Sequence, residues 1–75
     1  MKIGDKVKIL SGDFKGRAGK IRARHFNVLP SEMKRIKAGV KLTGKDNETL
    51  YSVRIDGEKD NMYFPENCLE LISDR

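Results

Sequence analysis

The stretch GDKVKILSGDFKGRAGKI, residues 4–21, decides the fold of this chain. In its first part charged and apolar residues alternate, with Val7 and Ile9 on one face and Lys6 and Lys8 on the other. A period of two residues is typical of a half-buried strand. A glycine-rich segment follows, and then the alternation resumes. The stretch therefore predicts two antiparallel strands joined by a glycine-rich loop.

The three loop glycines Gly12, Gly16 and Gly19 are predicted to serve the backbone rather than a nucleotide. Glycine adopts positive φ without a steric cost and lets two strands approach closely. A nucleotide phosphate loop requires G-x-x-x-x-G-K-[ST], but Phe14 stands at the first glycine position and Ile21 at that of the metal-binding hydroxyl. The spacing also departs from G-x-G-x-x-G. We expect the glycines to form a turn.

Alternation and turn residues predict three further strands. LYSVRID (residues 50–56) alternates strictly, DGEKD (56–60) begins with the Asp-Gly pair of a hairpin turn, and NMYF (61–64) returns as the next strand. PENCLELI (65–72) contains a proline-led single turn and a short last strand. Five short strands with polar turns predict a mainly β fold, a small barrel.

Residues 27–48 interrupt this pattern and are predicted to form a short helical or irregular insertion. Pro30 suits a helix start, Ser31 is a candidate N-cap, and EMKRIK (32–37) favours one or two helical turns. The segment 40–42 has the composition of a short strand. The insertion therefore separates the second and third barrel strands.

The charge of the chain is unevenly distributed. The 75 residues carry a formal net charge of +5, but residues 1–45 contain 13 Lys/Arg and three Asp/Glu, whereas residues 46–75 contain three and eight. A basic face attracts polyanions or acidic proteins over about a Debye length, ~8–10 Å. The asymmetry favours a nucleic acid or an acidic protein as partner, although scattered lysines also keep a domain soluble.

Size and composition argue against an enzyme. A chain of 75 residues is expected to form one domain, residues 1–75, with little room for an enclosed substrate cavity. His25 and Cys68 are each the only residue of their type, so no nucleophile–base pair or metal-ligand set can be assembled. We expect no catalytic residue, metal or cofactor. The single cysteine and the lack of a signal peptide or membrane-length apolar run predict a cytoplasmic monomer that binds no membrane.

The order of residues in 4–21 resembles the KOW motif, the strand–loop–strand element shared by several ribosomal proteins and NusG-type transcription elongation factors. In that family the glycine corresponding to Gly16 is the signature, and the motif sits in an SH3-like barrel that contacts RNA or a protein. The resemblance implies a small five-stranded SH3-like barrel and a translation or transcription context. The matching residues are Gly4, Asp5, Val7, Ile9, Gly12, Lys15, Gly16, Gly19 and Ile21.

The cations in and after the loop are the candidate binding residues. Two of them flank Gly16, and three more alternate along the following strand, where we expect one face with intervals of ~6.6–7 Å. Phosphates of a single strand are separated by a comparable distance, so such a row matches a nucleic-acid backbone without reading sequence. Phe26 or His25 at the strand end is a further candidate for stacking on bases. The predicted nucleic-acid-binding residues are Phe14, Lys15, Arg17, Lys20, Arg22 and Arg24.

Two functions fit these observations. The first is a binding module for RNA or a nucleic-acid backbone that acts through the basic strand–loop–strand face. The second is protein docking, as an SH3-like adaptor or a small accessory subunit of a larger complex that meets an acidic partner. The acidic second half and the insertion at 27–48 suit the second function better. The fold does not decide between them, because the same small barrel hosts many roles.

Overall fold

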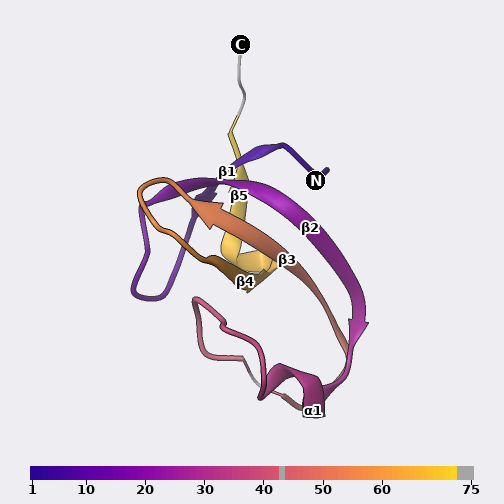
Figure 1. The fold of residues 1–75 in the computed structure, drawn as a ribbon. Coiled ribbons are helices and arrows are strands. Elements are labelled where there is room, and N and C mark those ends of the chain that lie inside the picture. Colours follow the sequence, from indigo (N-terminus) through magenta and orange to yellow (C-terminus); the bar gives the residue numbers. More distant parts are fainter. Residues whose placement is uncertain (43, 73–75) are drawn as a thin grey trace.

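A computed structural model describes residues 1–42 and 44–72 of the chain. Its five strands pair antiparallel in one sheet with the order β4–β3–β2–β1–β5 (Figure 1). This mainly β architecture confirms the predicted fold class and fits a small SH3-like barrel. The elements are β1 (Lys6–Ile9), β2 (Ala18–Val28), α1 (Pro30–Met33), β3 (Glu48–Ile55), β4 (Asn61–Pro65), the 3-10 helix η1 (Glu66–Cys68) and β5 (Leu69–Leu71).

The loop between β1 and β2 is closed by its own backbone. Gly16 N donates to the carbonyl of Ile9 at 2.8 Å, and Ile9 N donates to the carbonyl of Arg17 at 2.8 Å. Gly12 and Gly16 have φ of +85° and +90°, in the left-handed region that glycine adopts without Cβ strain. Both glycines are therefore required by the turn itself.

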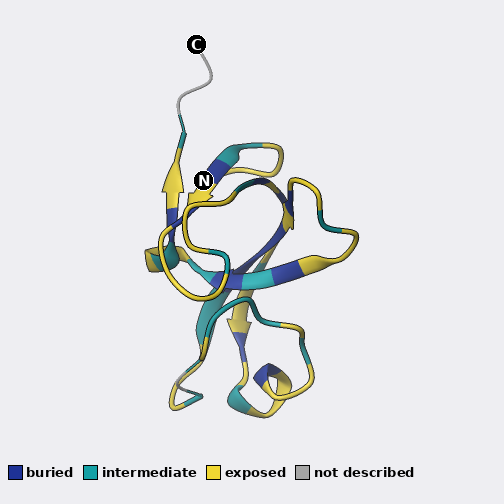
Figure 2. Ribbon diagram, turned by 90° about the vertical axis from the view of Figure 1, so that its left-hand side faces the viewer, coloured by how far each residue is buried: buried dark blue, intermediate teal, exposed yellow. Residues whose placement is uncertain are grey.

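The core lies on the inner face of the curved sheet. Buried residues alternate with exposed or half-buried ones along β1, the first part of β2 and β4, as the sequence pattern predicts, whereas residues 50–53 of β3 are all buried (Figure 2). Phe64 is the largest fully buried side chain. The main core cluster draws on all five strands and consists of Val7, Ile9, Ile21, Tyr51, Val53, Ile55, Met62, Phe64 and Leu69.

The 3-10 helix η1 connects β4 and β5, the two outer strands of the sheet order. It follows Pro65, as expected for a proline-led single turn. Leu10 N donates to the carbonyl of Cys68 at 2.8 Å, which ties the end of β1 to η1. The chain therefore returns across the end of the barrel through a single short turn.

The insertion lies between β2 and β3, at residues 29–47, because β2 extends to Val28 and β3 begins at Glu48. Its helix α1 begins at Pro30, which needs no partner for a backbone N–H at the first helical position. The N-cap residue is Leu29, and no side chain caps the helix. The predicted Ser31 cap is wrong because Pro30 already occupies the first turn, which places Ser31 inside the helix.

The predicted strand at 40–42 is also wrong, because the chain pairs with β4 slightly earlier. Ala38 forms an isolated parallel bridge with Tyr63. Tyr63 N donates to the carbonyl of Lys37 at 2.9 Å, and Gly39 N donates to the carbonyl of Tyr63 at 3.0 Å. Residues 40–42 then leave β4 without forming a strand.

The insertion also packs on the outer face of the sheet. Successive strand residues point to opposite faces, so Leu50 and Tyr63 point away from the main core. There they join Val28, Met33, Ile36 and Leu42 in a second hydrophobic cluster.

Among the residues that the structure describes, no helix is long and apolar enough to span a membrane.

Candidate nucleic-acid interface

Three cations lie side by side on the outer face of the sheet. Lys20 on β2 is directly opposite Lys6 on β1 and directly opposite Arg54 on β3. Opposed residues on neighbouring antiparallel strands have Cβ atoms ~4.5–5.5 Å apart. Lys20 and Arg54 are exposed, and Lys6 is half-buried. We call Lys6, Lys20 and Arg54 the cross-strand row.

The cross-strand row concentrates positive charge at a cost to stability, because like charges directly opposite each other repel. Within residues 1–42 and 44–72 no carboxylate lies within 4.0 Å of any of the three cations. Arg54 Nε donates to the carbonyl of Glu58 at 2.8 Å, which orients the guanidinium without neutralising it. An arrangement of this kind suits a polyanionic ligand.

Replacing Lys20 by glutamate is expected to stabilise the fold by ~0.5–1 kcal/mol, because two repulsive pairs become attractive ones. The midpoint of urea unfolding measures this gain, which should shrink in about 0.5 M salt. Lys15→Glu makes the same charge change at an exposed loop position and is the matched control. If K20E were no more stable than K15E, the row would carry no electrostatic strain.

A β-bulge at Arg22 divides the cations of β2 between two faces. Arg22 has no partner on β3, so β2 has one residue more than β3 at this point. Before the bulge Lys20 is opposite Arg54, and after it Arg24 is opposite Tyr51. Positions 51 and 54 are three residues apart on a strand that pairs regularly with β4, so they face opposite sides. The predicted single row along one face is wrong, because the extra residue shifts the alternation.

The loop side chains contribute to the fold as well as to the charge. Arg17 Nη2 donates to the carbonyl of Asp56 at 2.7 Å and lies 3.7 Å from Glu58 Oε2, which links the loop to the turn between β3 and β4. Phe14 is half-buried and packs against the main core cluster. Lys15 is exposed at the loop tip. Arg17 and Phe14 therefore fix the loop, and Lys15 extends from it.

Arg24 and Phe26 form a pair at the far end of β2. The Arg24 guanidinium carbon lies 5.5 Å from the centroid of the Phe26 ring, and Nη1 donates to the carbonyl of Met1 at 3.2 Å. The Phe26 side chain is 64% exposed. His25, between them, packs on Tyr63 with ring centroids 5.1 Å apart. Of the two stacking candidates at the strand end, Phe26 is the more accessible.

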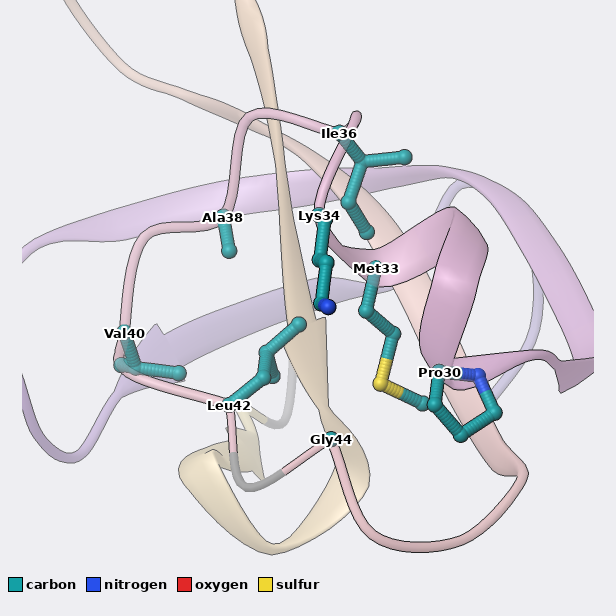
Figure 3. A pocket seen from close by; sticks show the side chains of 8 residues that line it. All are labelled: Pro30, Met33, Lys34, Ile36, Ala38, Val40, Leu42 and Gly44. Carbon is teal, nitrogen blue, oxygen red and sulfur yellow. The ribbon is translucent and has the colours of Figure 1, made fainter.

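A pocket of about 410 Å³ lies within the insertion (Figure 3). Figure 3 shows the Met33 side chain ending next to Pro30, and the side chains of Leu42 and Lys34 extending into the space between α1 and the segment 38–42. Apart from Lys34 the lining side chains are apolar, and this combination suits an apolar side chain next to a carboxylate. The lining residues, none of which belongs to the cross-strand row, are Pro30, Met33, Lys34, Ile36, Ala38, Val40, Leu42 and Gly44.

Sequence reasoning did not identify Lys6 and Arg54 as partners of Lys20. Each lies on the polar face of its own alternating strand, and this is the only sequence signal that marks them. Their alignment follows from the strand register.

The described part of the chain contains no group of three His, Cys, Asp or Glu side chains that could hold a metal ion.

Comparison with known protein families matches the KOW motif to residues 3–24. The matched segment comprises β1, the loop and the first part of β2 through Arg24. A search of curated proteins gives no match. KOW motifs are non-catalytic binding motifs found in RNA-binding ribosomal and transcription proteins. The chain thus carries a KOW motif within a small all-β fold that fits an SH3-like barrel.

Proposed function

We propose that this protein binds the backbone of RNA through the outer face of β1, β2 and β3, in a translation or transcription context. The observation that carries the proposal is the cross-strand row, three neighbouring cations without an acidic partner in the described chain. The KOW motif supports a nucleic-acid partner in general. Of the predicted cations, Lys20 belongs to the row and Lys15 lies on the loop, whereas Arg17 is held by the turn between β3 and β4 and Arg24 lies on the opposite face.

The row suits phosphate groups rather than base edges. Its three side chains span two strand spacings, ~10 Å, which is enough to contact two consecutive phosphates of one strand. The lysines act as point charges, whereas Arg54, whose Nε is held by the Glu58 carbonyl, presents its two terminal nitrogens. Contacts to phosphate position a nucleic acid and carry no sequence information. We therefore expect affinity that depends on salt and little on sequence.

Salt dependence is the direct test. Three cation–phosphate contacts on a single strand, one for each cation of the row, predict a slope of about −2.1 for the logarithm of the binding constant against that of salt concentration, a loss of about 20-fold between 50 and 200 mM. Fluorescence anisotropy of a labelled RNA of about 12 nucleotides measures this slope. Two RNAs of permuted sequence should bind equally. Affinity that does not change with salt would disprove the proposal.

The pocket in the insertion favours a second candidate function, docking on an acidic protein segment that places one apolar side chain near Lys34. An NMR titration of the labelled protein separates the two functions. Shifts at Lys6, Lys20 and Arg54 on addition of RNA at low salt support the first. Shifts at Pro30 to Leu42 on addition of an acidic, leucine-containing peptide, with an unresponsive sheet, support the second.

A further inference from the structure

The far half of β2 has a free edge. β1 pairs with β2 only at positions 18–20. The N-terminal segment adds two hydrogen bonds at Ile21. Gly4 N donates to the Ile21 carbonyl at 2.7 Å, and Ile21 N donates to the Asp5 carbonyl at 2.9 Å. From Arg22 to Val28, the backbone pairing found in the described chain is with β3 alone. Figure 1 shows this part of β2 at the margin of the sheet. The bulge at Arg22 thus lies where the free edge begins.

The cations of β2 follow this edge from one face to the other. Lys20 lies on the outer face in the cross-strand row, Arg22 is the exposed extra residue at the edge, and Arg24 lies on the opposite face. Next along the strand is the exposed ring of Phe26. A second register shift accompanies Phe26, with Asn27 at a φ of 53°. Bulges commonly redirect a side chain, and here Phe26 and His25 point to different surroundings.

We infer that the ligand is single-stranded nucleic acid, which bends round the free edge of β2 and stacks an unpaired base on Phe26. This inference rests on the proposed function and specifies the form of its ligand. Phosphates contact Lys20, Arg22 and Arg24 in succession. The base lies on the open side of the Phe26 ring, with the Arg24 guanidinium near the same ring. A basic path combined with an exposed aromatic ring is typical of single-strand binding.

The placement of the cations on two faces excludes a duplex from this path. A duplex is stiff, with a persistence length of ~50 nm for DNA, and does not bend round the edge of a sheet. It therefore contacts the cross-strand row or the Arg24 side, but not both. Its bases are also paired and stacked, so none is available to Phe26. A single strand meets neither restriction.

The test compares one RNA of about 12 nucleotides, single-stranded or annealed to its complement, at low salt. Phe26→Ala is expected to weaken single-strand binding about tenfold, within the range for loss of one stacked base, and to leave duplex binding unchanged. Phe26→Tyr keeps the ring and should keep single-strand affinity. Lys20→Gln lies in the cross-strand row and should weaken both ligands. Because Phe26 is largely exposed, the alanine variant should fold normally.

Three outcomes would overturn the inference. F26A could weaken both RNAs equally, F26A could leave single-strand binding unchanged, or the native protein could bind the duplex as tightly as the single strand. Salt-dependent binding in any of these cases still supports the proposed function. If the native protein bound neither RNA at low salt, the proposed function itself would fail.

Discussion

Replacing Gly19 by alanine is expected to lower the free energy of unfolding by about 3 kcal/mol, the upper part of the range for overpacking. A Cβ atom at this position would lie 2.5 Å from the Arg54 carbonyl oxygen and 2.9 Å from Ile55 Cα. Both are backbone atoms and cannot rotate away, so β2 would have to separate from β3. A chain of this length has a total stability of only about 4–11 kcal/mol. Urea unfolding followed by circular dichroism measures the loss.

Gly16→Ala is the informative comparison for Gly19→Ala. Gly16 has a φ of +90°, and a Cβ atom at this position would have no heavy atom within 4 Å apart from those of its chain neighbours. Gly16→Ala is therefore expected to lower the free energy of unfolding by about 1–2 kcal/mol, which comes from backbone conformation alone. Gly16→Asn should cost less than Gly16→Ala, because asparagine tolerates this region better. Equal losses for G16A and G19A would contradict the argument that Gly19 is required by close strand approach.

The triple variant K6E/K20E/R54E is expected to lose RNA affinity by about 100-fold or more at low salt. Three phosphate contacts disappear, which makes the slope of the logarithm of the binding constant against that of salt concentration shallower by about 2. Three carboxylates then repel the RNA backbone. Fluorescence anisotropy with the single-stranded RNA gives both the affinity and the slope. The effect should be far larger than that of any single replacement, because the three cations face the same phosphates.

The triple variant K34E/K41E/K45E is the control for this experiment. It makes the same change in formal charge at three exposed positions of the insertion. Only the long-range attraction weakens in this variant, so we expect a loss of a few fold with an almost unchanged salt slope. If the two triple variants lost affinity equally, RNA would be responding to net charge rather than to the cross-strand row.

The strands were predictable from sequence because their signal is local. Alternation around Val7 and Ile9 and the Asp56-Gly57 turn require only neighbouring residues to be recognised. The helix start at Pro30 has the same local character. The predicted Ser31 cap was wrong because Pro30 and Ser31 both suit the start of a helix, and the sequence alone does not say which of them begins it.

The candidate site was only partly predictable, because it depends on register. Lys20 was identified from its own strand, but its neighbours Lys6 and Arg54 come from strands whose alignment is set by packing. The bulge leaves no trace in the sequence, since Arg22 and Arg24 continue the alternation that begins with Lys20. One unpaired residue thus moved Arg24 to the other face without any change in pattern.

The bonds between Tyr63 and the segment 37–39 bear on self-association. β4 is the last strand of the sheet order, and its outward N–H and C=O groups would otherwise be a template for a strand of another molecule. Lys37 and Gly39 occupy the groups of Tyr63 from within the same chain. The insertion therefore occupies the outward backbone groups of Tyr63 in the middle of β4, and a strand of a second copy would have to displace it to pair there.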